Sequence, residues 1–286
     1  MKRTILILLA AFVFLAALGI TVYPLVSNYV NDRYASEVRT DYTRKVQELD
    51  DTEIQKAFAA AQAYNESLLP LRFSKEAVQT ASEEYDRMLN LNDSGIMGYV
   101  EIPQIQVKLP IYHGTGEDIL QKGVGHLTGS SLPIGGEGCH CVLTGHSGVA
   151  GNRLFSDLDQ LQVGDVFYLY ILDQTLAYQV TEINRVLPHE TDLLAPVAGK
   201  DLCTLVTCYP YGVNSHRLLI RGTRIPYEDA VIIEEQAAAN EAPAKSTWKE
   251  QYYAGLAIGG GTAVVAIVVG AIILLLRRKR RCPNEK

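Results

Sequence analysis

Three residues at the ends of apolar runs form a set that can carry out acyl transfer: Cys208, His146 and Arg217. A Cys thiolate is a strong nucleophile, and a neighbouring imidazolium favours the thiolate and can protonate a leaving amine. An Arg guanidinium stays protonated, so it cannot act as a base, but it can donate hydrogen bonds to an oxyanion or a substrate carbonyl. This set therefore needs no acidic member.

The segment TLVTCYPYGVNSHR, residues 204–217, indicates how two of these residues meet. It reads as a strand that ends at Cys208, a loop of turn-forming residues, and a second strand that opens at Arg217. If the strands are antiparallel neighbours, the loop 209–216 holds Cys208 and Arg217 near each other at one rim of a sheet. His146 follows another short strand, CVLTG, and loops on a rigid scaffold are where active sites usually lie.

Other residues compete for the same roles. His216 is the nearest base to Arg217 in the chain, although strand alternation places their side chains on opposite faces. Arg221 shares the face of Arg217 and is the alternative guanidinium, further from the rim. The remaining histidines are expected to be structural or exposed: His113, His126, His140 and His189.

The other cysteines raise the questions of a metal site and of disulfides. Cys139, His140 and Cys141, together with His146 and Cys203, include enough ligand types for zinc. Their spacing matches no C-x₂-C pattern, and adjacent strand residues point apart, so no metal is expected. Cys139 and Cys141 share a strand face and are expected to be small core residues, or one partner in a disulfide with Cys203.

Apolar segments near the two ends predict membrane anchoring. Residues 4–26 follow two basic residues and are long enough to span a bilayer, with a cleaved signal peptide as the alternative. Residues 254–276 form a second candidate span, and the tail 277–286 opens with RRKRR. Because basic flanks tend to stay in the cytoplasm, both termini are expected inside and the region between the spans outside the cell membrane.

Residues 27–97 are expected to form a helical prelude. Residues 32–64 contain no Pro or Gly, and this composition favours helix up to the point where Pro70 breaks it. A second helical stretch is predicted over 76–91. This prelude is expected to pack against the next domain and to cover part of it.

Short strands divided by turns follow from Gly98 onward. The run DVFYLYIL, the turn DQ and the run TLAYQVTEINRVLP predict a hairpin. Several such strands with few helices predict a mainly β domain, a closed β-barrel over 98–227. Residues 228–253 are expected to tether this barrel to the second span. The net charge of −6 gives no indication of nucleic-acid binding.

Several blocks of the chain resemble the class C, or pilus-type, sortases. TLVTCYPYGVNSHRLLIRGTR (204–224) is similar to their active-site segment, and GVGHLTGSSLPIGGEG, VLTGHSG and LFSDLDQLQVGDVFYLY resemble the earlier blocks in the same order. The resemblance covers roughly residues 27–225 and extends to the anchors. It implies an eight-stranded sortase β-barrel with His146 as acid/base, Cys208 as nucleophile and Arg217 stabilising substrate and oxyanion.

The resemblance also implies a membrane-anchored cysteine transpeptidase without a metal or organic cofactor. In such enzymes the thiolate attacks the Thr carbonyl of an LPxTG-like sorting signal, and an amine resolves the thioester acyl-enzyme. The expected acceptor is a lysine of a pilin subunit, so the expected partners are pilins or other surface proteins with such signals. Three alternatives stay open: a housekeeping-type sortase that uses a peptidoglycan precursor, a cysteine hydrolase, and a non-catalytic disulfide-bonded scaffold in which Cys208 is paired.

One departure from the family concerns the lid. Many class C sortases carry an Asp-Pro-aromatic motif before the barrel that blocks the site, and no Asp-Pro occurs in this sequence. The corresponding place reads SLLPLRFSKE (67–76). Arg72 and Phe73 are the lid candidates, with Phe73 expected near Cys208, and a loose or vestigial lid is the alternative.

Overall fold

The computed structural model describes residues 2–71, 73–74, 84–91, 94–148, 151–240 and 270. Every element discussed below lies in one compact unit, Met1–Ala244, and Lys245–Lys286 form a second unit. The predicted span 254–276, apart from Gly270, and the tail 277–286 lie outside the described residues.

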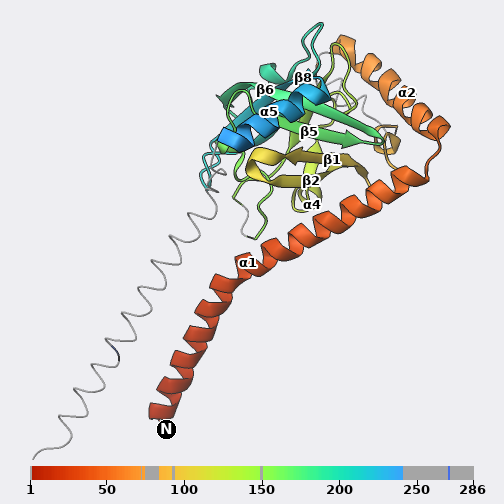
Figure 1. Ribbon diagram of the computed structural model, residues 1–286. Coiled ribbons are helices and arrows are strands. Elements are labelled where there is room, and N and C mark those ends of the chain that lie inside the picture. Colours follow the sequence, from red (N-terminus) through yellow and green to blue (C-terminus); the bar gives the residue numbers. More distant parts are fainter. Residues whose placement is uncertain are drawn as a thin grey trace, which may run out of the picture. The chain divides into compact units, whose positions relative to one another are not determined.

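Eight strands in the described part of the chain form a closed barrel in the order β1-β2-β3-β4-β7-β8-β6-β5 (Figure 1). The strands are β1 (Ile96–Ile102), β2 (Val107–His113), β3 (Val124–His126), β4 (His140–Thr144), β5 (Val166–Ile171), β6 (Gln174–Val186), β7 (Leu202–Tyr209) and β8 (His216–Ile225). Antiparallel pairing of β1 with β5 closes the sheet. The prediction of a mainly β fold with a closed eight-stranded barrel is confirmed.

Tight connections set the register of the predicted strands. The β5–β6 hairpin pairs Ile171 with Gln174, so its two-residue turn is Leu172-Asp173, one residue earlier than predicted. Leu172 adopts a φ of 51°, the left-handed conformation that such short turns require. Short helical turns join several other elements: η1 (Leu69–Leu71), η2 (Tyr85–Arg87), η3 (Pro103–Ile105), α4 (Glu117–Leu120), η4 (Leu158–Gln160) and η5 (Asp192–Leu194).

The barrel interior is packed with fully buried large side chains. Tyr178, Phe155 and Phe167 are among the largest of them, and the rings of Phe167 and Tyr178 stack with centroids 5.5 Å apart. Burying each such side chain contributes about 1.5–3 kcal/mol relative to leaving it exposed. The resulting rigid barrel is the scaffold on which the strand ends near residues 146, 208 and 217 are held.

The helical prelude consists of two helices, α1 (Lys2–Glu48) and α2 (Asp51–Leu68), so the predicted helix over 32–64 is confirmed except for a break at residues 49–50. Asp50 caps α2: its side chain accepts from the Glu53 backbone N–H at 2.8 Å, and the Glu53 carboxylate accepts from the Asp50 N–H at 3.1 Å. A capping box of this kind starts a new helix. The predicted helix 76–91 lies largely outside the described residues, and its described end contains η2.

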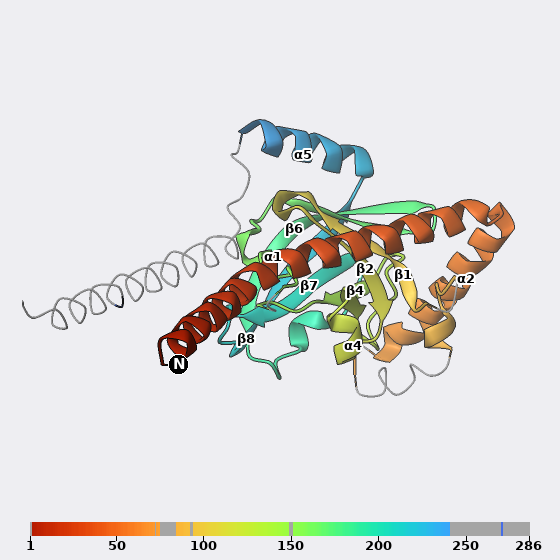
Figure 2. The ribbon, with the colours of Figure 1, turned by 90° about the horizontal axis from the view of Figure 1, so that it is seen from below.

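The second half of α1 packs along β1 and β2 (Figure 2). Tyr42 anchors it, because its hydroxyl donates to the Met97 carbonyl at 2.9 Å and accepts from the Leu172 N–H at 2.8 Å. Arg39 adds a hydrogen bond to the Lys108 carbonyl at 2.6 Å. Within the described residues, α1 is the one helix long and apolar enough to cross a membrane, and its apolar stretch near the N-terminus is exposed.

The segment predicted to be a tether, 228–253, begins as helix α5 (Tyr227–Asn240). This helix contacts β5 and β6 through the fully buried Ala230 and through a hydrogen bond from the Tyr168 hydroxyl to Glu234 at 2.8 Å. The chain therefore stays against the barrel for the length of α5, and the remaining residues of the segment lie outside the described ones.

Candidate active site

The β7–β8 ladder places Cys208 directly opposite Arg217. Directly opposite residues of antiparallel strands project from the same face, so the thiol and the guanidinium share one side of the sheet. The guanidinium is tied to its own loop: Arg217 Nη1 donates to the carbonyls of Asn214 at 3.3 Å and His216 at 3.1 Å. Both residues are half-buried at the rim.

His146 reaches this rim because β4 runs parallel to β7 and the chain then turns away. The turn is tied to β7 by two hydrogen bonds, one from the Gly145 N–H to the Val206 carbonyl and one from the Thr207 hydroxyl to the Gly145 carbonyl. Gly145 is required here because a Cβ would lie 2.8 Å from the buried Phe155 ring. His146 is thereby fixed beside the end of β7.

Cys208, His146 and Arg217 line one pocket with a volume of about 400 Å³. Four buried side chains that line it pack together, and we call this cluster the apolar base: Val142, Leu194, Val206 and Leu219. The segment between β6 and β7 adds Pro188, Glu190 and Thr191 to the lining. The arrangement offers a nucleophile, an acid/base and a cationic hydrogen-bond donor beside a pocket shaped for apolar side chains.

Glu117 also belongs to this site, and the sequence reasoning missed it. Its Oε2 lies 3.3 Å from His146 Nε2, across 29 positions of the chain. The only signal in the sequence is the acidic pair in GTGEDIL, which is typical of the first turn of any helix. Nothing in that pattern indicates that the turn lies against His146.

The rival base His216 does not line the pocket. It pairs with Tyr209 in the ladder, and its Nδ1 contacts the Ser215 hydroxyl at 2.9 Å. His126 is fully buried and contacts the Tyr85 hydroxyl at 2.9 Å, as expected of a structural histidine. His113 contacts two backbone carbonyls, and His189 is exposed.

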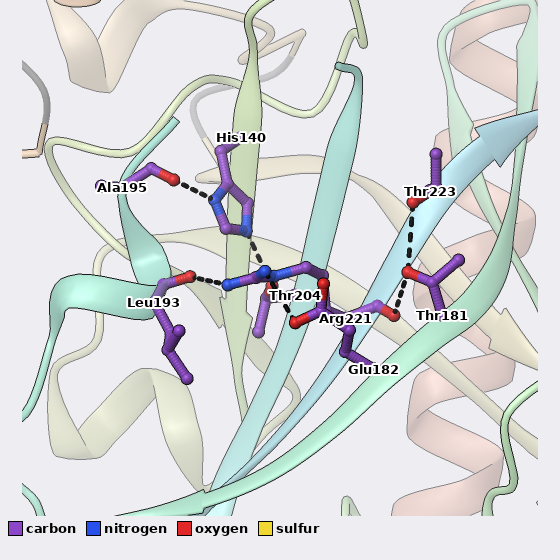
Figure 3. A network of polar contacts seen from close by, with 8 residues as sticks. All are labelled: His140, Thr181, Glu182, Leu193, Ala195, Thr204, Arg221 and Thr223. Atoms are coloured by element: carbon purple, nitrogen blue, oxygen red, sulfur yellow. Dashed lines mark hydrogen bonds and ion pairs between the residues drawn. The ribbon is translucent and has the colours of Figure 1, made fainter. Parts of the chain in front are cut away.

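The alternative guanidinium, Arg221, is buried and is engaged in a polar network (Figure 3). It donates to the Glu182 carboxylate at 2.9 Å and to the Leu193 carbonyl. In the same network His140 Nδ1 lies 3.0 Å from the Ala195 carbonyl, and its Nε2 lies 2.7 Å from the Thr204 hydroxyl. These contacts hold the segment between β6 and β7 against the barrel, which gives Arg221 and His140 structural roles.

The four described cysteines are free thiols. Cys141 and Cys203 are register neighbours on β4 and β7 and are buried in the core, and burial raises the pKa of the Cys203 thiol. The proposed pairing of Cys203 with Cys139 or Cys141 is therefore wrong, and so is the scaffold alternative, which requires a paired Cys208. Cys139 is also buried, which agrees with a small core residue.

Phe73, a lid candidate, lines the same pocket as Cys208 and packs against its apolar base. Its φ of 53° is a left-handed conformation, uncommon for a residue with a large side chain. Arg72, the other lid candidate, lies outside the described residues.

Comparison with known proteins relates this geometry to a family. A family model described as the sortase domain matches residues 100–225. Sortase C1 of Streptococcus agalactiae is 44% identical, with 66% of this chain and 98% of that chain covered and a TM-score of 0.62. The chain belongs to the sortase family. A sortase C of Streptococcus pneumoniae is 46% identical to this sortase, with 67% and 97% covered and a TM-score of 0.61, so the resemblance to class C is confirmed.

A further solved structure and two curated relatives extend the comparison. Sortase C of Clostridium perfringens, solved with the C-terminal cell wall sorting motif, is 46% identical to this sortase, with 67% of this chain and 100% of that chain covered and a TM-score of 0.60. Sortase D of Bacillus subtilis is 33% identical over 45% of this chain, and Sortase A of Bacillus anthracis is 31% identical over 46%. The matches span 63% and 61% of those two relatives, about three fifths of their length.

Proposed function

We propose that this sortase is a membrane-anchored cysteine transpeptidase that joins pilin subunits. It cleaves an LPxTG-like sorting signal at the Thr carbonyl, holds the acyl group as a thioester on Cys208, and transfers it to a lysine amine of a pilin. The observation that carries this proposal is the placement of Cys208, Arg217 and His146 around one pocket at the barrel rim.

Each residue has a role that follows from its chemistry. The Cys208 thiolate attacks the Thr carbonyl carbon, and Arg217 donates to the oxygen that becomes negatively charged. His146 protonates the departing amine, so the C–N bond breaks and the thioester remains. The apolar base of the pocket, formed by Val142, Leu194, Val206 and Leu219, provides a surface for the apolar side chains of the sorting signal.

The comparisons favour the pilus-type enzyme over the housekeeping-type alternative. The solved structures at 44–46% identity are class C sortases, and the structure from Streptococcus pneumoniae is described in terms of pilin substrate specificity. For the Clostridium perfringens enzyme, the sorting motif itself is part of the structure. The curated relatives named Sortase A share less identity with this chain, 26–31%.

Two apolar segments support the proposed location. The apolar helix α1 anchors the enzyme, and the span predicted over 254–276 provides a second anchor. Both termini then lie in the cytoplasm and the barrel lies outside the cell membrane, where sorting signals of exported proteins are accessible.

Phe73 serves as the lid in place of the Asp-Pro-aromatic motif. Its contact with the pocket base puts an aromatic ring where the apolar side chains of the sorting signal bind. Substrate entry then requires this ring to leave, so the thiol of Cys208 is less accessible in the resting enzyme than its position at the rim indicates.

A competition between acceptors tests the proposal. The purified full-length enzyme receives an LPxTG-type peptide with equal amounts of a pilin lysine peptide and a peptidoglycan-type peptide amine. Mass spectrometry is expected to detect a thioester on Cys208, lost in Cys208→Ala and kept in Cys203→Ala, and a product joined mainly to lysine. Preference for the peptidoglycan-type amine, or release of the acyl group to water alone, would overturn the pilin assignment.

A further inference from the structure

Glu117 is placed to contact the second substrate rather than to support the fold. Its side chain is 71% exposed, whereas the His146 side chain beside it is 25% exposed. An exposed ion pair contributes little to stability, because solvent screens it and both side chains lose freedom. Glu117 Oε1 also accepts from Gln121 Nε2 at 3.2 Å, which orients the carboxylate toward His146.

The Glu117 carboxylate contacts His146 at the edge of the pocket and is not among the residues that line it. The apolar base and Arg217 lie where the sorting signal and its carbonyl oxygen are expected under the proposed function. Glu117 is the first residue of α4, whose last residue Leu120 lines the pocket, and its carboxylate lies beside His146. A molecule that attacks the thioester must pass His146, because His146 is the base that receives its proton.

The acceptor reaches the site carrying a positive charge. A lysine amine has an ordinary pKa of about 10.4, so it is protonated at neutral pH and is attracted by a carboxylate. The charged groups that line the pocket itself are placed differently: Arg217 repels an ammonium, and Glu190, in the segment between β6 and β7, accepts from the Leu187 N–H at 2.8 Å. Glu117 is therefore the acidic group placed beside the base.

We propose that Glu117 is the acceptor-binding residue of this sortase, and that its carboxylate captures the protonated lysine amine next to His146. The ammonium takes the place of the imidazole at the carboxylate, which frees His146 to act as base. This inference rests on the proposed function, because it names the residue that selects the amine in the transfer step.

The transfer step balances with the groups present. The ammonium loses one proton to solvent, and the neutral nitrogen attacks the thioester carbon. A C–N bond forms, the C–S bond breaks, and the sulfur leaves as the Cys208 thiolate. His146 accepts the second proton from the nitrogen, so the thiolate–imidazolium pair needed for the next cycle is regenerated.

The test compares a charged acceptor with a neutral one in the full-length enzyme. Rates of transfer from an LPxTG-type peptide are measured with a lysine peptide, which is cationic, and with hydroxylamine, which is neutral at the assay pH. The variants are Glu117→Gln, Glu117→Asp and the matched control Asp118→Asn. Asp118 is exposed and carries the same charge, but its carboxylate turns back toward Gly116.

We expect Glu117→Gln to raise the KM for the lysine peptide about fivefold at low salt. This factor corresponds to the loss of the attraction between two opposite unit charges about 4 Å apart in water. The rate with hydroxylamine stays within about twofold, and at 1 M NaCl the difference between the enzymes shrinks because the Debye length falls to about 3 Å. Glu117→Asp keeps part of the lysine preference, and Asp118→Asn behaves like the unmodified enzyme.

Two outcomes would overturn the inference. An equal loss with both acceptors means that Glu117 acts only by positioning His146, and no loss with either means that it has no role in the reaction. Failure of the unmodified enzyme to transfer to either amine would instead contradict the proposed function. Transfer to hydroxylamine by Glu117→Gln is the control that shows that the variant is folded.

Discussion

The strands β4, β7 and β8, with the turn after β4, carry the same three residue types twice. The rim set is Cys208, His146 and Arg217, and the interior set is Cys203, His140 and Arg221. The rim set opens into a pocket of about 400 Å³. The interior set is buried, and His140 and Arg221 contact protein partners in the network of Figure 3.

The difference between the two sets shows that residue type alone does not make an active site. Burial lowers the pKa of His140 to about 4, so this imidazole is neutral: Nδ1–H donates to the Ala195 carbonyl, and Nε2 accepts from the Thr204 hydroxyl. Arg221 donates through Nη1 to Glu182 and through Nη2 to the Leu193 carbonyl. A buried group held by protein partners stabilises the fold, whereas a half-buried group that lines the rim pocket can act on a substrate.

The largest expected effect is on kcat/KM, and it distinguishes Arg217 from Arg221. Because Lys cannot reproduce the planar fork of Arg, Arg217→Lys is expected to lower kcat/KM by about 10²–10³-fold without changing the unfolding temperature. Arg221→Lys breaks a partly buried ion pair and is expected to lower that temperature by about 5 °C while kcat falls much less. Kinetics and thermal unfolding of the two variants check this, and the reverse pattern would show that Arg221 is the catalytic cation.

A smaller effect is expected from the pH dependence of stability. The pKa of His140 is about 4 in the folded chain and about 6.5 when unfolded, so the unfolded chain takes up the proton first. The stability gained from neutral His140 is present above pH 6.5 and is lost as the pH falls toward 4, about 2 kcal/mol of it by pH 5.

Thermal unfolding at pH 7.5 and pH 5 measures this loss. We expect the drop in unfolding temperature to be smaller in His140→Gln, which has no titrating imidazole at this position. The exposed His189 provides the matched control, since His189→Gln is expected to keep the full drop. An identical drop in His140→Gln would show that other groups cause it.

The smallest effect concerns access to the rim set. If Phe73 covers the pocket, Phe73→Ala speeds alkylation of Cys208 by a factor on the order of three to ten, because the closed state loses its contact with the apolar base. Mass spectrometry of the Cys208 peptide measures the rate. Phe58→Ala, on α2 and packed against the main core, controls for general loosening. An unchanged alkylation rate in Phe73→Ala would contradict the assignment of Phe73 as a lid.

Much of the fold could be read from local patterns. Alternating runs and their turns predicted the barrel, and the spacing between Cys208 and Arg217 predicted their pairing, because a short loop leaves neighbouring strands few registers. The break between α1 and α2 was missed, although the capping box at Asp50 and Glu53 was present in the sequence. The composition of this segment, which lacks Pro and Gly, did not indicate the boundary. Composition reports helix propensity, whereas the capping box acts through two particular side chains.

The sequence alone determined the family, the barrel and the rim set, including His146, because each follows from residues close together or from blocks in a given order. Only the tertiary structure decided that His216 lies outside the pocket, that Arg221 is committed to Glu182, and that Glu117 touches His146. These outcomes depend on which loops meet when the barrel closes. Contacts between residues distant in the chain are set by that closure, and no local pattern of residue types encodes them.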